Sequence, residues 1–348
     1  MSPEALAEQS LNFAQHRSDS LAADAADCER AGVFELPAPL ALHHGGTIDS
    51  PRLAWRLVGE AGLPVVVALG GISAHRVVYD RQPRMGWWQS VVGPGLALDS
   101  ARCRVLGIDY LGGCGQSSGP AAGEQFPSLS SYDQAEALVL LLEHLQLRCV
   151  RAIVGASYGG MVALAFAERH PARVQQLIVI SAADRTHPMA TAWRSVQRRI
   201  VRLGIEVGRS AEGLQLARAL AMATYRSPEE FAARFAEPPR RVDGRFVFPV
   251  EEYLCARGRD YAERYRPEAF ICLSESIDLH AVDAARISTP TTVIGVREDL
   301  LVPIADMRAL AQRLPRSSLH EISSVHGHDA FLKEEAQLRP IFQILFGE

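Results

Sequence analysis

Short runs of consecutive Val, Ile and Leu residues alternate with longer amphipathic stretches along much of the chain. The runs lie at 65–69, 105–109, 150–154, 177–181, 291–296 and 319–322. Runs of this kind are typical of parallel strands, which are buried on both faces. Apolar residues at helical spacing predict helices over 132–145 and 159–170, the second ending before Pro171. The pattern predicts an α/β fold with a doubly wound, mostly parallel sheet.

The pattern changes between residues 187 and 282, where the chain is charged, rich in arginine and mostly helical. We expect this segment to be a helical cap, inserted into one α/β core of residues 31–186 and 283–348. A cap in this position would cover the carboxyl ends of the strands, where open α/β sheets bind ligands. Residues 1–30 have few β-branched or aromatic side chains, which predicts a flexible N-terminal arm.

Composition narrows the class of protein. The formal net charge of −4 over 348 residues gives no electrostatic reason to expect nucleic acid or a membrane surface as a partner. No apolar run is long enough to span a membrane, and the N-terminus lacks the features of a secretory signal. The six cysteines form no CxxC pair, which favours reduced thiols. We therefore expect a cytoplasmic protein.

The clearest chemical motif is Gly155-Ala156-Ser157-Tyr158-Gly159, which has the pattern G-x-S-x-G. It lies between a predicted buried strand and a predicted helix. In the α/β-hydrolase fold this strand–turn–helix exposes the serine as a nucleophile, and small residues two positions to either side let the backbones pass. Ser157 is therefore the candidate nucleophile, in an α/β-hydrolase fold.

A serine nucleophile needs a histidine base and a carboxylate that orients it. In this fold the acid and then the histidine follow the serine along the chain. Asp299, just beyond the strand at 291–296, is the candidate acid, and Glu298 is the alternative. His328 is the candidate base, because it follows a glycine and opens the expected final helix; His326 is the alternative.

The oxyanion of an acyl-transfer intermediate needs two backbone N–H donors. The first candidate is Tyr158, at the start of the helix after Ser157. The second should come from the glycine-rich loop after the strand at 65–69, with Gly70 favoured and Leu69 as the neighbour. A simple tight turn would also explain the glycines.

Several further motifs lie between about residue 63 and the C-terminus. They are GWW at 86–88, VGPG at 92–95, LGGCGQSSGP at 111–120, WRSVQRRI at 193–200, TYRS at 224–227 and GHDAFL at 327–332. These segments resemble the homoserine O-acyltransferases of methionine biosynthesis. These are α/β-hydrolase-fold enzymes that transfer an acyl group from coenzyme A. The segments occur in the family's order, which makes the resemblance much stronger than one match would.

The resemblance implies functions for particular residues. Arg198 would bind the carboxylate of the amino acid, Asp329 its ammonium group, and Tyr225 would also contact substrate. The implied substrates are acyl-CoA and L-homoserine, which react in turn through an acyl-serine, with no bound cofactor and no metal. The family also implies a homodimer that forms through the cap. The implied catalytic residues are the three already found, Ser157, Asp299 and His328.

The sequence leaves the substrates partly open. The loop GGISAH at 70–75 and Tyr158 both differ from the forms common in the family, so acetyl-CoA and succinyl-CoA are both candidate donors. A succinyl carboxylate would need a cation in the acyl pocket. Arg194 and Arg199 are near Arg198, but we expect them to point in other directions on the helix.

Three other functions use the same features. Serine differs from homoserine by one methylene, worth only about 1–3 kcal/mol of discrimination, so a serine O-acyltransferase is an alternative. An esterase or thioesterase would use the same three catalytic residues. A non-catalytic binding protein of this fold is disfavoured, because Ser, Asp and His occur in the catalytic order.

Overall fold

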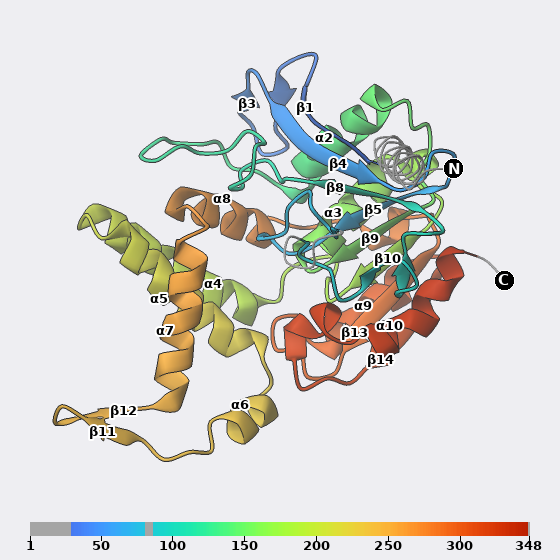
Figure 1. Ribbon diagram of the computed structural model, residues 1–348. Helices are drawn as coiled ribbons and strands as arrows, with labels where there is room; N and C mark the ends of the chain where they lie inside the picture. The colour runs from blue at the N-terminus through green and yellow to red at the C-terminus, as the bar shows by residue number, and fades with distance from the viewer. Residues whose placement is uncertain (1–28, 81–85, 347–348) are drawn as a thin grey trace, which may run out of the picture.

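An eight-stranded sheet forms the centre of the molecule. The computed structural model describes residues 29–80 and 86–346 (Figure 1). The strand order is β1-β4-β8-β5-β9-β10-β13-β14, parallel from β8 onward, with β4 antiparallel to both β1 and β8. The strands are β1 (Glu29–Glu35), β4 (Arg52–Val58), β5 (Val65–Leu69), β8 (Arg104–Ile108), β9 (Ala152–Ala156), β10 (Leu177–Ile180), β13 (Thr291–Val296) and β14 (Ser317–Ile322).

The predicted α/β class with a mostly parallel sheet is confirmed. The largest shift in a predicted strand is at 150–154, because Val150 makes only an isolated bridge with Val174 and β9 begins at Ala152. At the sheet edge, β14 begins two residues earlier than the apolar run, at Ser317. An edge strand is exposed on one side, so polar residues can extend it.

Alternate residues of each central strand enter two separate apolar layers. In β5, Val67 and Leu69 join the layer that contains helices α2 (Ser131–His144) and α3 (Tyr158–Arg169). Val66 and Ala68 join the layer of α10 (Glu335–Phe342). Both faces of the sheet are covered, which is why its central strands are continuously apolar in sequence.

The N-terminal edge of the sheet also carries two short strands. Between β1 and β4 the chain forms a small hairpin of β2 (Leu40–Ala41) and β3 (Thr47–Ile48). Gly45 and Gly46 at its turn have φ of 91° and 89°, a conformation that favours glycine. The expected arm, 1–30, lies outside the described residues except for Glu29 and Arg30, which belong to β1 instead.

The segment expected to form the cap contains five helices and one small hairpin. In Figure 1, α4, α5 and α7 extend to one side of the sheet, and the hairpin lies beyond the lower end of α7. Every one of these helices except α5 has proline at its first position. The N–H that proline lacks would have no partner within the helix at this position, so no hydrogen bond is lost. The elements are α4 (Pro188–Glu206), α5 (Ser210–Tyr225), α6 (Pro228–Arg234), β11 (Arg240–Val242), β12 (Arg245–Val247), α7 (Pro249–Ala262) and α8 (Pro267–Asp278).

Shorter elements connect these parts. A two-stranded parallel sheet lies in the connection from β5 to β8, and α9 packs on β13 and β14. They are β6 (Val92–Gly93), β7 (Leu98–Asp99), η1 (Pro171–Arg173), η2 (Ala284–Arg286), α9 (Ile304–Arg313), η3 (Gly327–Leu332) and η4 (Gln343–Leu345).

A capping box determines where α2 begins. The Ser130 hydroxyl accepts a hydrogen bond from the backbone N–H of Asp133, and the Asp133 carboxylate accepts one from the Ser130 N–H at 2.7 Å. The same carboxylate accepts a hydrogen bond from the backbone N–H of His43, also at 2.7 Å. Asp133 therefore joins the N-terminal loop to the start of α2.

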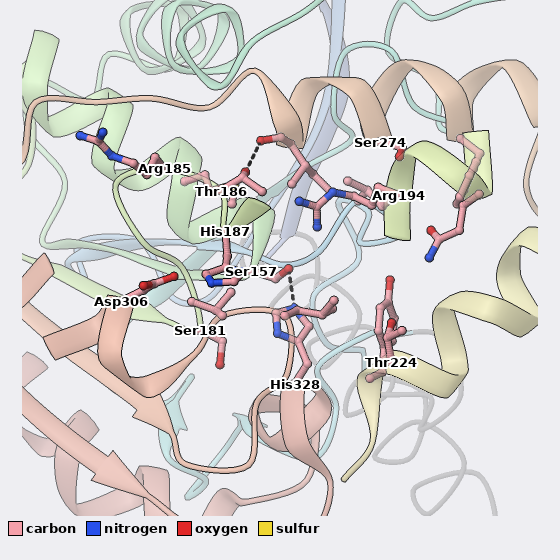
Figure 2. Close-up of a pocket in the computed structure, with 18 residues that line it drawn as sticks. Ser157, Ser181, Arg185, Thr186, His187, Arg194, Thr224, Ser274, Asp306 and His328 are labelled. Atoms are coloured by element: carbon pink, nitrogen blue, oxygen red, sulfur yellow. Dashed lines mark hydrogen bonds between the residues drawn. The ribbon is translucent and has the colours of Figure 1, made fainter. Parts of the chain in front are cut away.

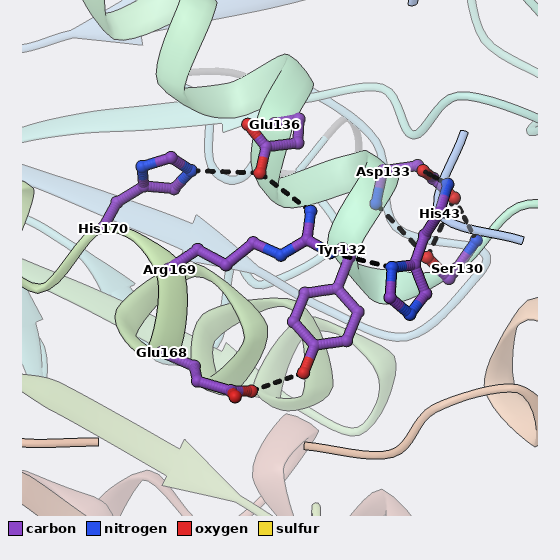
Figure 3. A network of polar contacts seen from close by, with 8 residues as sticks. All are labelled: His43, Ser130, Tyr132, Asp133, Glu136, Glu168, Arg169 and His170. Carbon is purple, nitrogen blue, oxygen red and sulfur yellow. Dashed lines mark hydrogen bonds and ion pairs between the residues drawn. The ribbon is translucent and has the colours of Figure 1, made fainter. Parts of the chain in front are cut away.

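A polar network joins α2 to α3 (Figure 3). The Arg169 guanidinium lies 4.1 Å from the centre of the Tyr132 ring and donates hydrogen bonds to Glu136 and to Nδ1 of His43. Burial, followed by the Arg169 charge, lowers the pKa of His43, which favours the neutral ring that can accept this bond. These contacts hold α2 against α3, so we assign the network a structural role and no part in catalysis.

The cap rejoins the core at His280, which is buried. Its Nε2 lies 3.1 Å from the carbonyl oxygen of Ala183 and must donate to it, so Nδ1 accepts the hydroxyl hydrogen of Ser131 at 2.8 Å. Burial lowers the pKa of His280 to about 4. The ring is therefore neutral in the folded protein near neutral pH.

This histidine should make stability fall toward acid. In the unfolded chain the ring binds a proton near its ordinary pKa of about 6.5, whereas in the folded chain it stays neutral down to about pH 4. The unfolded state therefore binds more protons in this window, which lowers the free energy of unfolding by up to roughly 3 kcal/mol as pH falls. Urea unfolding of wild type and His280→Gln between pH 7 and 4 measures this contribution. We expect a shallower pH dependence in the variant; equal slopes would contradict the assignment.

Candidate active site

Ser157 lies on the turn between β9 and α3, with φ 55° and ψ −125°. A left-handed φ is uncommon for a residue with a side chain and persists only where the surroundings enforce it. A Cβ added to Gly155 would lie 2.3 Å from the carbonyl oxygen of Gly159, and one added to Gly159 would lie 2.3 Å from that of Leu69. The two glycines of the motif are therefore required by the close approach of three backbone segments.

The structure brings Ser157, His328 and Asp299 into one hydrogen-bonded chain. Ser157 Oγ lies 2.8 Å from His328 Nε2, the contact drawn in Figure 2, and His328 Nδ1 lies 2.7 Å from Asp299 Oδ2. The other oxygen of Asp299 accepts hydrogen bonds from the N–H groups of Leu301 and Val302. With Nδ1–H donating to Asp299, Nε2 is the nitrogen that can accept the serine proton.

The alternative acid and base are occupied elsewhere. Glu298 accepts hydrogen bonds from the Ser323 hydroxyl and from the backbone N–H of Ser324. Nδ1 of His326 lies 2.7 Å from the Arg226 guanidinium. The structure thus joins Asp299 and His328 to Ser157 and leaves the alternatives apart. His328 does not open the final helix as expected, but lies in the 3-10 turn η3 that precedes α10.

Asp299 changes the proton affinity of His328. Burial by itself would lower the pKa of the ring, but the charge of Asp299 and its hydrogen bond outweigh burial, so the pKa of His328 is raised. The charge on Asp299 favours a ring that has taken a proton from Ser157. This is the electrostatic condition for a histidine that acts as a general base.

Two cavities meet at Ser157 and His328, and both are also lined by Ile72, Tyr225 and Ile277. The inner cavity, of about 40 Å³, is the one drawn in Figure 2. The outer cavity has about 150 Å³. The two cavities differ in the other polar side chains that line them. The inner cavity has Ser181, Arg185, Thr186, His187, Arg194, Gln197, Thr224, Ser274 and Asp306, and the outer cavity has Ser73, Arg218 and Asp329.

The loop after β5 reaches the nucleophile one residue later than expected. Gly71 and Ile72 line the outer cavity, and a Cβ on Gly71 would lie 4.0 Å from Ser157 Oγ. In the described part of the chain, the N–H groups of Gly71, Ile72 and Tyr158 donate no hydrogen bond. Gly70 lines neither cavity, because its carbonyl accepts the Gly159 N–H at 2.9 Å and its Cα faces Trp87; Leu69 is buried in β5.

The Tyr158 side chain points away from both cavities. It is fully buried, and its hydroxyl lies 2.6 Å from Ser276 Oγ of α8. Burial raises the pKa of this phenol, so it remains a neutral hydrogen-bonding group. Its departure from the usual family residue therefore affects how the core meets the cap, while its backbone N–H stays beside Ser157.

Comparisons with known proteins show the family to which the chain belongs. A family described as alpha/beta hydrolase fold matches residues 64–335. A homoserine O-succinyltransferase of Xanthomonas campestris is 45% identical over 86% of this chain and 80% of its own length. The chain belongs to the homoserine O-acyltransferase family. A second relative, a serine O-succinyltransferase of Litchfieldella anticariensis, is 33% identical over 88% of this chain and 96% of its own length.

A solved structure extends the comparison to the fold. The homoserine O-acetyltransferase of Staphylococcus aureus has a TM-score of 0.79, with 24% identity, and the match covers 92% of this chain and 96% of that one. At this identity the likeness shows the shared fold alone. The resemblance that the sequence motifs indicated is confirmed by the more similar relatives.

The arginine predicted from the family's α4 motif lies outside the cavities. Arg198 Nη1 donates to the Asp278 carboxylate and, at 3.0 Å, to the carbonyl of Ser274. Arg194 donates to the same carboxylate at 2.8 Å and lines the inner cavity. Our expectation that Arg194 points in another direction from Arg198 is wrong, because residues four apart share one face of a helix. Figure 2 shows the Arg194 side chain directed from α4 toward the cavity.

The other two predicted substrate residues, Asp329 and Tyr225, line the outer cavity. They share it with Arg218, which the sequence reasoning missed. The Arg218 guanidinium lies between two phenol rings, 5.1 Å from the centre of Tyr225 and 4.7 Å from that of Tyr261. Among the described residues no carboxylate lies within 4.0 Å of it. Arg218 precedes Tyr225 by two helical turns, a spacing that could have indicated the pair.

Other site types are not seen in the described ranges, 29–80 and 86–346. No cluster of three or more His, Cys, Asp and Glu side chains there could hold a metal ion. No helix among them has the length and apolarity that crossing a membrane requires. The five cysteines within these ranges are free thiols.

Proposed function

We propose that this chain transfers a succinyl group from succinyl-CoA to the side-chain hydroxyl of L-homoserine, in methionine biosynthesis. One observation carries the proposal: Arg218 and Asp329 line the cavity that also holds Ser157 and His328. A free amino acid carries a carboxylate and an ammonium group, and these two side chains supply the opposite charges. The relative named homoserine O-succinyltransferase, at 45% identity, supports both the acceptor and the donor.

The first half-reaction acylates the serine. His328 Nε2 takes the hydroxyl proton as Ser157 Oγ attacks the thioester carbonyl carbon. The N–H of Tyr158 and one N–H of the Gly71–Ile72 segment would stabilise the oxyanion, because all three donors are uncommitted and near Ser157. The C–S bond then breaks, His328 returns its proton to the departing thiolate, and an ester on Ser157 remains.

The second half-reaction reverses these steps with another nucleophile. The homoserine hydroxyl gives its proton to His328 Nε2 as its oxygen attacks the ester carbonyl, and the C–O bond to Ser157 then breaks. Ser157 recovers the proton and O-succinylhomoserine leaves. Because water could take the place of homoserine, the cap must keep the acyl-enzyme dry until the amino acid binds.

The acceptor subsite is the outer cavity. Arg218 is the proposed ligand of the homoserine carboxylate, since a guanidinium fork matches a carboxylate and its own neighbours are tyrosines. Asp329, which lies 3.3 Å from Arg226, is the proposed ligand of the ammonium group. Tyr225 lines the same cavity, and the centre of its ring lies 5.7 Å from that of the His328 ring. Arg198 was our sequence-based candidate for binding the homoserine carboxylate. We propose instead that it holds the Asp278 carboxylate, which also contacts Arg194.

The inner cavity is the proposed succinyl subsite. Arg194 supplies the cation that a succinyl carboxylate needs and that an acetyl group does not. Ser181 adds a polar group, since it is fully buried at the cavity wall and its hydroxyl has no hydrogen-bond partner within the described structure. Its left-handed φ of 49° indicates a backbone that the surroundings hold in place.

Serine is the second candidate acceptor, because the Litchfieldella relative is named for it. The same charges would hold its carboxylate and ammonium groups.

We also propose a cytoplasmic homodimer, as the family resemblance implies. Exposed apolar side chains on the cap support the dimer, and light scattering would measure the mass in solution. They are Val196, Leu203, Val207 and Leu216.

The reaction itself can be tested through the fate of the acyl-enzyme. With succinyl-CoA alone we expect one rapid equivalent of CoA and then slow turnover, which homoserine accelerates by about a hundredfold or more. Ser157→Ala should lower kcat by roughly four orders of magnitude while the circular dichroism spectrum stays unchanged. Steady-state CoA release that homoserine does not accelerate would identify a hydrolase instead.

The acceptor subsite predicts a selective defect in Arg218→Gln. A hydrogen bond between charged groups contributes about 1.5–3 kcal/mol, so the KM for homoserine should rise about ten- to a hundredfold. The matched control is Arg209→Gln, at the exposed start of α5. Steady-state kinetics with homoserine as the varied substrate measure the change. An unaltered homoserine KM would remove Arg218 from the acceptor site.

The donor subsite predicts a change of selectivity in Arg194→Gln. We expect kcat/KM with succinyl-CoA to fall at least about tenfold relative to acetyl-CoA, because only the succinyl group has a carboxylate for Arg194. Arg199→Gln, on the exposed face of the same helix, is the control. Equal losses with both donors, or a rise in homoserine KM with both, would contradict the assignment.

A further inference from the structure

A third cavity, of about 430 Å³, lies between α5, α6 and α7 and is here called the arginine cavity. Arg218 lines both this cavity and the outer cavity, so the two adjoin at that residue. One carboxylate, Asp260, is among its lining residues. The cations that line it are Arg218, Arg226, Arg234, Arg257 and Arg264.

Three of these arginines have carboxylate partners. Glu230 lies 3.6 Å from Arg226 and 3.4 Å from Arg234, and Asp260 lies 2.7 Å from Arg257. Arg264 differs, because its Nε donates to the backbone carbonyl of Asp260 at 3.0 Å and it forms no salt bridge within the described residues. Together with Arg218, it leaves the cavity with an excess of positive charge.

We propose that the arginine cavity binds the phosphate groups of the acyl-CoA donor, with Arg264 as a direct ligand. The inference rests on the proposed function only in that the donor is a coenzyme A thioester. In such a donor the pantetheine arm separates the reacting carbonyl from the phosphates. With the carbonyl at Ser157, the arm occupies the outer cavity and the phosphates lie beyond Arg218. Guanidinium groups that are not already neutralised are suited to phosphate oxygens.

This placement also determines the order in which CoA leaves and homoserine binds. The pantetheine arm and the amino acid use the same outer cavity, beside Arg218. Homoserine can therefore reach Arg218 and Asp329 only after CoA has left. Overlap of the two sites gives a physical reason for separate half-reactions through an acyl-serine.

The test compares two donors that differ in their phosphates. Succinyl-CoA carries them, and the succinyl thioester of N-acetylcysteamine has none. For Arg264→Gln we expect the ratio of kcat/KM for succinyl-CoA to kcat/KM for the short thioester to fall at least about tenfold. Arg259→Gln is the matched control, since Arg259 is exposed on the neighbouring helix and does not line the cavity. Its ratio should equal that of wild type.

The outcomes separate this inference from the proposed function. An unchanged ratio in Arg264→Gln, with wild type active on succinyl-CoA, would overturn the phosphate site and leave the proposed reaction standing. No homoserine acylation by wild type from succinyl-CoA, from acetyl-CoA or from the short thioester would overturn both. Product inhibition gives a second readout: the inhibition constant of CoA should rise by a similar factor in Arg264→Gln, and an unchanged constant would overturn the phosphate site.

Discussion

The left-handed turn at Ser157 is the constraint on which the site depends. It is possible only because Gly155 and Gly159 let the end of β9, the start of α3 and the end of β5 approach within van der Waals contact. The turn places the serine hydroxyl beside His328 and leaves the Tyr158 N–H at the open end of a helix. A side chain at either glycine would separate these segments and move Ser157 away from His328.

The arginines on the two sides of Ser157 are held in place by different kinds of neighbour. On the inner side Asp278 holds both Arg194 and Arg198, so those cations are positioned by a partially buried carboxylate. On the outer side Arg218 is held by tyrosine rings, which position a guanidinium without neutralising it. We therefore assign the outer cation to the carboxylate of the free amino acid, since the tyrosine rings leave its charge available.

The cap is joined to the core by buried polar contacts. Tyr158 reaches Ser276 of α8, and His280 joins Ser131 to Ala183. Buried polar groups are costly unless they are paired, so these contacts restrict how the cap can sit on the core. Because the cap supplies Arg194 and Arg218 and the core supplies Ser157, the position of the cap defines the two subsites that we propose.

The sequence by itself predicted the buried strands and the three candidate catalytic residues, because these depend on local patterns and on chain order. Continuous apolar runs indicated the buried strands, because a sheet covered on both faces has no polar positions. The G-x-S-x-G turn indicated Ser157, because the two glycines are required by close backbone contacts around that residue. Asp299 and His328 followed from the order in which this fold supplies its acid and base.

Only the tertiary structure decided which side chains share a cavity. Arg198 and Arg194 lie on one face of α4, yet only Arg194 reaches the space beside Ser157. Arg218 joins Asp329, 111 positions further along the printed sequence, through the packing of α5 on η3. Such pairs depend on how a cap helix sits against a core turn, which buried contacts across the whole chain determine and no local pattern records.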